Sequence, residues 1–235
     1  MKIFAISDLH LSINNPKPMN IFGEVWDYYI EDIFEDWKEK VSQEDVVLLA
    51  GDFSWAMKLE DTKKDFELLK DLPGKKILIR GNHDYWWKGI SSVRNFVPEG
   101  FYAIQNDAIK FENIIICGTR GWTVPEENEE QSDEDKKIFD REVIRLEMAL
   151  SQASKLKTDE KDKIVVMIHY PPCNFKRDNS AFTDLFEKYN VSAVVYGHLH
   201  GYKRASLYFK KNGIDYYLTS CDMVGNRLTE ITFDE

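Results

Sequence analysis

The sequence predicts an α/β fold, built either as a sandwich of sheets or as one sheet covered on both faces. Short apolar runs of strand length recur between segments with helical spacing, which is the α/β pattern. Several of these runs are almost continuous Val, Ile and Leu, as in strands that are buried on both faces. The 235 residues, 43% of them hydrophobic, suffice for one sizeable core. We therefore expect a single domain over residues 1–235.

Strands and helices alternate along most of the chain. The runs that read as strands are residues 2–7, 45–50, 76–80, 114–117, 163–168 and 193–196. Helical spacing covers residues 22–40, 59–72 and 135–157. In the first helix, one apolar face is formed by Phe22, Val25, Trp26, Tyr29, Ile33, Phe34 and Trp37. The later segments 207–209, 215–220 and 228–233 read as antiparallel strands, joined by glycine-containing turns, that close a sheet.

The charge and the cysteines restrict the classes of partner and compartment. A formal net charge of −10 opposes non-specific binding to nucleic acid or anionic lipid, because such binding neutralises phosphates with Lys and Arg. Cys117, Cys173 and Cys221 lie far apart without CxxC spacing, so we expect neither a disulfide framework nor a thiolate zinc site. No window reaches the roughly 18 apolar residues of a membrane span, and the first residues do not resemble a signal sequence. These features favour a cytoplasmic protein that does not enter a membrane.

One stretch departs from globular composition. Acidic side chains dominate residues 126–135, and an amphipathic segment follows them. We interpret residues 125–157 as an insertion within the domain, made of a solvated acidic loop and a surface helix. A metal-binding or lid role for the acidic run is the alternative interpretation.

All five histidines of the chain follow predicted strands and lie beside Asp, Asn or another His. They are His10, His83, His169, His198 and His200. In α/β proteins, ligands bind at the carboxyl edge of the sheet, which is where such residues would meet. Each motif alone is also typical of an ordinary polar loop. Their repetition at five strand ends favours a metal centre.

Two further features of these motifs suit a shared site. Alternate residues of an extended segment point the same way, so Asp8 with His10, and His198 with His200, are expected to aim at one site. Glycines at 51, 81 and 197 precede Asp52, Asn82 and His198, where a missing Cβ permits sharp turns and close backbone approach.

The order of the motifs resembles that of the calcineurin-like metallophosphoesterase superfamily, whose signature is DxH, GD, GNH followed by Asp or Glu, a lone His, and GHxH. The blocks in this chain are Asp8-Leu9-His10, Gly51-Asp52, Gly81-Asn82-His83-Asp84, His169 and Gly197-His198-Leu199-His200. They extend from residue 8 to residue 200, and none is missing. The resemblance implies a βαββαβ-type core of two packed mixed sheets flanked by helices.

The resemblance also implies a dinuclear metal centre. Its implied ligands are Asp8, His10 and His200 for one ion and Asn82, His169 and His198 for the other, with Asp52 bridging both. Imidazole and carboxylate ligands without thiolates suit Mn, Fe or Zn, with Co or Ni as alternatives. Two such ions with a bridging hydroxide are suited to hydrolysing a phosphoester.

Residues beyond the metal ligands are expected to contact the substrate. The resemblance makes His83 the phosphate contact or the general acid, and Asn82 lies beside it. The GDxxDRG motif of Ser/Thr protein phosphatases is absent after Gly51-Asp52, so Asp84 is the nearest residue to orient His83, unless it caps a helix. Arg120 is our candidate for binding phosphate oxygens, with Lys176 and Arg177 as further candidates.

Several aromatic residues lie beside the motifs and are expected either to line the substrate cleft or to pack the loops: Trp55, Trp86, Trp87, Trp122, Tyr170 and Tyr202.

The leading interpretation of the chain is a phosphohydrolase that acts on a small phosphomonoester or phosphodiester, with nucleotides among the candidate substrates. A nuclease of the same superfamily and a non-catalytic metal-binding scaffold are the alternatives. The acidic charge disfavours nucleic acid, and the scaffold would be expected to have lost ligands.

Overall fold

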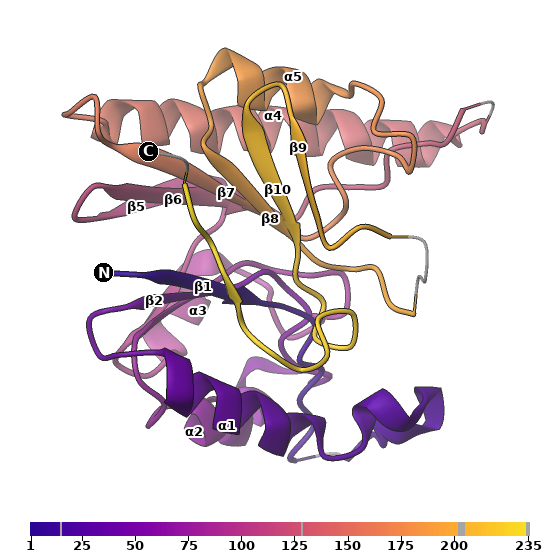
Figure 1. Ribbon diagram of the computed structural model, residues 1–235. Helices are drawn as coiled ribbons and strands as arrows, with labels where there is room; N and C mark the ends of the chain where they lie inside the picture. The colour runs from indigo at the N-terminus through magenta and orange to yellow at the C-terminus, as the bar shows by residue number, and fades with distance from the viewer. Residues whose placement is uncertain (15, 128, 202–204, 234–235) are drawn as a thin grey trace.

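Two mixed β-sheets pack face to face in the computed structural model, which describes residues 1–14, 16–127, 129–201 and 205–233 (Figure 1). The strand orders are β11-β1-β2-β3-β4 and β5-β6-β7-β8-β10-β9. Strands β1 to β4 are parallel, and so are β6, β7, β8 and β10. The edge strands β11, β5 and β9 pair antiparallel with their neighbours. Of the two arrangements that the sequence allows, the structure shows the sandwich.

The strands have the following bounds. The first sheet contains β1 Ile3–Ile6, β2 Val46–Leu49, β3 Lys75–Leu78, β4 Phe101–Ala103 and β11 Thr229–Glu230. The second contains β5 Asp107–Phe111, β6 Ile114–Thr119, β7 Lys163–Ile168, β8 Ala193–Tyr196, β9 Tyr208–Lys211 and β10 Ile214–Leu218. All six strands predicted from apolar runs are confirmed to within about two residues at each end.

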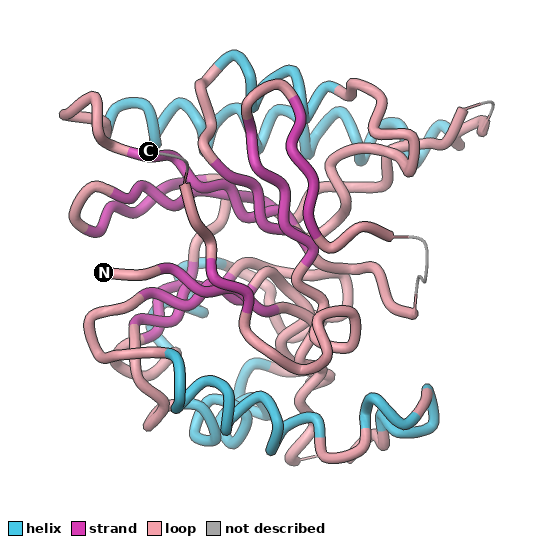
Figure 2. Tube along the Cα trace, in the orientation of Figure 1, coloured by secondary structure: helices cyan, strands magenta, loops and turns pink. Residues whose placement is uncertain are grey.

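Helices cover the outer face of each sheet and make a four-layer molecule (Figure 2). The helices α1 Tyr29–Lys40, α2 Lys63–Leu69 and α3 Ile90–Phe96 lie on the side of the first sheet. The helices α4 Asp133–Leu156 and α5 Ala181–Lys188 cover the second. The amphipathic segment after the acidic run is thus the long helix α4, which begins at the Ser132 N-cap.

The alternation of side chains along the central strands separates three cores. In β2, Val46 and Leu48 face the other sheet, whereas Val47 and Leu49 face the helices. In β7, Val165 and Met167 lie in the core between the sheets, and the residues on either side of them pack under α4 and α5. Both faces of these strands are buried, which explains why their sequences are continuously apolar.

The predicted helix over residues 22–40 is wrong in its first part. Tyr28 adopts a left-handed conformation (φ 56°), and α1 begins only at Tyr29. The preceding residues form two 3₁₀ turns, Met19–Phe22 and Glu24–Trp26, and the side chain of Phe22 is 68% exposed. Helical spacing of apolar residues does not reveal such a break, because the break depends on backbone conformation. Residues 59–72 likewise divide into a 3₁₀ turn, Leu59–Thr62, and the short helix α2.

The prediction that the C-terminal strands close a sheet is confirmed for β9 and β10, which form one edge of the second sheet, but β11 joins the first sheet instead. Strands β9 and β10 form the expected antiparallel hairpin, but β10 also pairs in parallel with β8. Strand β11 crosses to the first sheet and pairs with β1 through Phe4 and Glu230 (Figure 1).

Within the described residues, no helix combines the length and the apolar composition needed to cross a bilayer.

Candidate metal centre

The predicted motifs meet where the carboxyl ends of both sheets adjoin. Beyond β1, Ser7 donates its N–H to the Thr219 carbonyl at 2.8 Å, and Leu11 donates to the Phe53 carbonyl at 3.0 Å. The segment that carries Asp8 and His10 therefore lies between the loop after β2 and the loop after β10. Because strands of both sheets end here, residues that are far apart in sequence share one site.

One group of side chains, which we call the first cluster, consists of Asp8, His10 and His200. The Nε2 atoms of His10 and His200 are 3.4 Å apart, and His200 Nε2 is 3.3 Å from Asp8 Oδ1. Asp8 and His10 are buried, whereas the His200 side chain is one-third exposed. One donor atom from each residue lies within 4.8 Å of the others, a spacing that can hold a metal ion.

The second cluster consists of Asn82, His169 and His198. Asn82 Oδ1 lies 2.8 Å from His169 Nε2 and 2.9 Å from His198 Nδ1. Asp52 Oδ2 lies between the clusters, 3.4 Å from His169 Nε2 and 3.8 Å from His10 Nε2. Donor atoms of Asp8, Asp52 and His169 also lie within 4.8 Å of one another, so Asp8 adjoins both clusters.

The chemistry of the clusters fits divalent cations. Two ring nitrogens that face each other at 3.4 Å, as in His10 and His200, are not both protonated without repulsion. A cation that accepts both lone pairs removes this conflict, and imidazole with carboxylate is a donor set for transition metals. His10 Nδ1 is buried without a hydrogen-bond partner among the described residues.

The buried carboxylates give the site a negative potential. Burial lowers the pKa of His10 and of His198 to about 4. Burial also lowers the pKa of His169, but the Asp52 carboxylate outweighs it and raises the value to about 9. For His200, hydrogen bonds to Asp222 and Asp8 outweigh burial and raise the pKa to about 10. The negative potential that raises the pKa of His169 and His200 also attracts a metal cation.

Contacts behind the clusters orient two of the imidazoles. His169 donates from Nδ1 to the Ala50 carbonyl at 2.9 Å, which leaves Nε2 free to face the second cluster. His200 Nδ1 lies 2.8 Å from Asp222 Oδ1, and the other oxygen of Asp222 accepts the Gly201 N–H at 2.9 Å. Sequence reasoning missed Asp222. Its position just beyond the last strand of the parallel set, β10, is the signal that indicates it.

Asp8 and His10 reach one cluster as predicted, but the backbone that carries the motifs is not extended, so the alternation of side chains in a strand is not the reason. Asp8, His10, Asp52 and His198 have positive φ values of 60°, 47°, 52° and 72°. Each such residue costs of order 1 kcal/mol or more, and such strain concentrates at functional sites. His198 and His200 consequently point to different clusters, not to the same one. Turns after the strands, and not the pleat, aim these side chains.

The expected close approach at the motif glycines is confirmed. A Cβ at Gly81 would collide with the Asp52 carboxylate, and one at Gly197 would collide with Asp8 Oδ2. At Gly51 it would lie 2.6 Å from His169 Nδ1. Glycine at these positions therefore lets buried carboxylates and an imidazole pack directly against the backbone.

His83 is held at the edge of the clusters by aromatic rings. Its ring centroid lies 4.5 Å from that of Trp55 and 5.6 Å from that of His10. The Trp55 ring also stacks on His10 at 4.6 Å. Burial lowers the pKa of His83, and the nearby Asp52 charge opposes this effect. The His83 residue is half-buried.

Asp84 binds backbone and not the His83 ring. Its buried carboxylate accepts N–H bonds from Asp52, Phe53, Ser54 and Gly81 and from the Trp86 indole. The His83 Nδ1 atom instead lies 3.4 Å from the Tyr85 hydroxyl. Asp84 thus joins the loops after β2 and β3, and the prediction that it orients His83 directly gains no support from these contacts.

The predicted phosphate-binding cations have other partners. Arg120 lies over the Trp122 ring and 3.8 Å from the buried Glu142 carboxylate of α4. Lys176 forms an ion pair with Glu127 of the acidic run, and Arg177 lies over the Phe209 ring. Their side chains are thus paired with other residues, whereas the Arg120 carbonyl accepts the N–H of His169 in the second cluster at 3.0 Å. The side-chain contacts brace loops instead.

The aromatic residues beside the motifs divide between core and site. Trp86 and Trp87 are buried in the core of the first sheet, whereas Trp55 contacts the first cluster. Tyr170 packs against His198 with ring centroids 4.1 Å apart. Tyr202 lies outside the described residues.

Comparisons with known proteins agree with the fold. A probable cyclic nucleotide phosphodiesterase of Coxiella burnetii is 22% identical over 219 residues, covering 85% of this chain and 76% of that protein. The phosphopantetheinyl hydrolase of Mycobacterium tuberculosis superposes with a TM-score of 0.58 and 15% identity, covering 99% of this chain and 96% of that one. A protein of Thermus thermophilus gives a TM-score of 0.54 and 12% identity, with 98% and 97% covered.

The sequence profile of one protein family matches residues 1–202, and the matched region contains all five motif blocks. This family is metal-dependent, which agrees with the two clusters of Asp and His side chains. The chain thus belongs to the calcineurin-like phosphoesterases and is a hydrolase that acts on phosphoester bonds.

Proposed function

We propose that this hydrolase uses two metal ions, one in each cluster, to cleave a small phosphomonoester or phosphodiester. The observation that carries the proposal is the position of Asp52, whose Oδ2 atom faces His10 of the first cluster and His169 of the second. A carboxylate between two cations lowers their repulsion, so Asp52 is suited to bridge them.

The residues have separate roles in this proposal. Asp8, His10 and His200 hold one ion, Asn82, His169 and His198 hold the other, and Asp52 contacts both. Mn, Fe or Zn suits these donors best, with Co and Ni as alternatives. When bound, such a pair supplies Lewis acidity toward phosphate oxygens and a bridging hydroxide as nucleophile.

His83 and Asn82 complete the proposed machinery. The His83 ring lies beside His10 of the first cluster, so it can donate a hydrogen bond to a phosphate oxygen or a proton to the leaving oxygen. Asn82 belongs to the second cluster and directly precedes His83 in the chain, so its side-chain amide is suited to donate to the same phosphate. Asp84 acts indirectly, by holding the backbone that carries Asp52 and His83.

A sequence relative and the net charge support a small substrate. The relative is described as a probable cyclic nucleotide phosphodiesterase, a name that denotes action on a small phosphodiester. The net charge of −10 opposes binding to a polyanion such as nucleic acid. A small phosphoester, with nucleotides among the candidates, therefore fits this chain better than DNA or RNA.

The test is metal-dependent turnover of chromogenic esters. The protein is stripped of metal and supplied separately with Mn, Fe(II), Zn, Co, Ni or Mg. Release of p-nitrophenol is then followed from p-nitrophenyl phosphate and bis(p-nitrophenyl) phosphate. We expect turnover with a transition metal, and a loss of at least about 100-fold in kcat in Asp52→Asn.

The matched control is Asp140→Asn, the same chemical change at an exposed position of α4. It is expected to retain the activity of the unmodified protein. Full activity of Asp52→Asn would contradict the bridging role. Tight binding of metal without turnover of either ester would contradict the proposed reaction and favour a metal-binding scaffold.

A further inference from the structure

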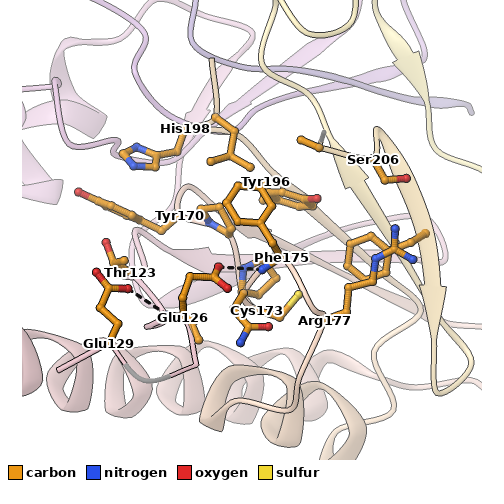
Figure 3. Close-up of a pocket in the computed structure, with 17 residues that line it drawn as sticks. Thr123, Glu126, Glu129, Tyr170, Cys173, Phe175, Arg177, Tyr196, His198 and Ser206 are labelled. Carbon is orange, nitrogen blue, oxygen red and sulfur yellow. Dashed lines mark hydrogen bonds between the residues drawn. The ribbon is translucent and has the colours of Figure 1, made fainter. Parts of the chain in front are cut away.

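A pocket of about 300 Å³ adjoins the second cluster, and nothing so far assigns it a role. We call it the side pocket. His198 and Tyr170 form the end of it nearest the clusters, and Figure 3 shows Arg177 on the far side. The Tyr170 ring packs on His198 and meets His169 edge-on at 5.5 Å. A group bound here would therefore extend from a phosphate held at the clusters.

The walls of the side pocket are mainly apolar. Pro171 and Pro172 come from the loop after β7, Tyr196 from the end of β8, and Phe209 from β9. The Arg177 guanidinium covers the Phe209 ring with its carbon 4.5 Å from the centroid. Such walls favour a substituent with an apolar body, because its burial removes apolar surface from water.

Two carboxylates set the charge of the side pocket. Glu126 accepts the Phe175 N–H at 2.9 Å, and its own N–H donates to Glu129 Oε2 at 3.0 Å. These bonds hold both carboxylates at the lining, and Arg177 is the one guanidinium or ammonium group among the described lining residues. The net charge of the described lining is therefore negative. A second phosphate or a carboxylate on the substrate would be repelled, whereas a hydroxyl, amide or amine would be attracted.

The size of the side pocket limits its occupant. A volume of about 300 Å³ is at the lower end of the range for small-molecule sites. It accommodates one organic substituent and not a polymer. The acidic residues after position 125, which the sequence presents as a solvated loop, thus contribute Glu126 and Glu129 to this lining.

We infer that the side pocket binds the organic substituent of the phosphoester and selects neutral or amino alcohols over anionic ones. This inference rests on the proposed function and adds the class of substrate to it. Glu129 is the carboxylate to substitute in a test, because Glu126 also holds the backbone of the facing loop through the Phe175 N–H.

The test compares esters that share one leaving group. Ethyl, choline and 2-carboxyethyl p-nitrophenyl phosphates carry neutral, cationic and anionic substituents and release the same p-nitrophenol. We expect the metal-loaded protein to prefer the choline ester to the carboxyethyl ester in kcat/KM. Glu129→Gln keeps an acceptor oxygen but removes the charge, so it should reduce this preference about threefold to fivefold. Glu130→Gln removes the same charge from the neighbouring position outside the lining and is the matched control.

A second variant tests the volume of the side pocket. Ala205→Phe places a ring at the lining and should raise KM for a phenyl ester relative to the ethyl ester by about tenfold, with circular dichroism confirming the fold. If every ester is hydrolysed but neither variant changes these ratios beyond the Glu130→Gln control, the side pocket is not the substituent site, and the proposed function still stands.

If no ester is hydrolysed, a binding measurement distinguishes failure of the proposed reaction from failure of the side-pocket inference. Phosphonate analogues, in which a methylene group replaces the oxygen of the leaving phenol, are titrated into the metal-loaded protein by calorimetry. Tighter binding of the choline analogue than of the carboxyethyl analogue, reduced in Glu129→Gln and retained in Glu130→Gln, supports the side pocket although the proposed reaction has failed. Equal binding of the two analogues overturns the inference.

Discussion

Single residues behind the clusters fix the direction of the imidazoles. His169 is anchored by a backbone carbonyl, whereas His200 is anchored by the Asp222 carboxylate. The Asp222 side chain is only 4% exposed, and its second oxygen is used by the Gly201 N–H. Carboxylates in this position fix the ring orientation of a metal-binding histidine and increase its basicity.

Substitution of Asp222 is therefore expected to weaken metal binding at the first cluster. Asp222→Ala should raise the dissociation constant for Mn about 10-fold to 100-fold, since the His200 ring loses its anchor. Isothermal titration of the metal-free protein measures this change, with Asp140→Asn as the control. An unchanged affinity would show that the backbone around His200 suffices to orient the ring.

Among the secondary-structure elements, the short helix α5 depends on its N-terminus. Ser180 accepts the Thr183 N–H at 3.2 Å, and the Thr183 hydroxyl accepts the Ser180 N–H at 2.8 Å, which is a capping box. The Ser180 hydroxyl also donates to the Pro172 carbonyl at 2.6 Å. The cap therefore connects α5 to a wall of the side pocket.

Loss of this cap should destabilise the protein. We expect Ser180→Ala to lower the free energy of unfolding by about 1–2 kcal/mol, because the Ser180 hydroxyl then no longer accepts the Thr183 N–H or donates to the Pro172 carbonyl. Urea unfolding measures the change. Ser180→Asn, which retains a capping oxygen, should restore most of the loss, and equal stability of all three proteins would contradict the capping role.

The connection between α4 and β7 is held by Asp162. Its carboxylate accepts hydrogen bonds from the Lys110 ammonium of β5 at 2.7 Å and from the N–H groups of Thr158 and Asp159 at 2.7 and 3.0 Å. Led by the Lys110 bond, these contacts hold the pKa of Asp162 well below its ordinary value. Its folded-state pKa is thus lower than its unfolded value of about 3.9.

The contribution of Asp162 to the free energy of unfolding should decrease as the pH is lowered. It is present above the unfolded pKa and is lost as the pH falls toward the folded pKa, because the unfolded chain then binds the proton first. We expect Asp162→Asn to be less stable than the unmodified protein at neutral pH, with the difference shrinking below about pH 4. Urea unfolding across this range tests it, with the exposed Glu160→Gln as the control. A constant difference would contradict the assignment.

At the scale of the whole molecule, the core between the sheets joins the two halves. Ile3, Ala5, Val46 and Leu48 of the first sheet and Met167 of the second belong to one buried cluster. The metal clusters also draw residues from both sheets. We propose on this basis that residues 1–235 form one domain that unfolds as a unit, with α4 as a layer of it.

A cavity in this shared core should destabilise both sheets equally. Met167→Ala is expected to cost about 2–5 kcal/mol, since Met167 is fully buried. Hydrogen exchange should show that the amides of β2 and β7 lose the same free energy of protection. Met148→Ala, at an exposed position of α4, should change stability little. Loss of protection in β7 alone would show that the sheets unfold separately.

The sequence alone determined which residues reach the site. Apolar runs identified the central strands, because a strand buried on both faces has no polar positions. The polar motifs follow these strands directly, and parallel strands end at one edge, so His10, His83, His169 and His200 were predictable as neighbours. The close packing at Gly81 and Gly197 was also predictable, because each glycine directly precedes a motif residue at the end of a strand.

The tertiary structure decided how these residues group and which others join them. His10 and His200 are 190 positions apart, and no local spacing encodes their 3.4 Å contact. The left-handed turns that send His198 and His200 to different clusters, the Asp222 anchor and the pairing of Arg120 with Glu142 also depend on long-range contacts. Local sequence patterns determine secondary structure and burial because they reflect the propensities of neighbouring residues. The directions of the side chains at this site depend instead on how the two sheets pack against each other.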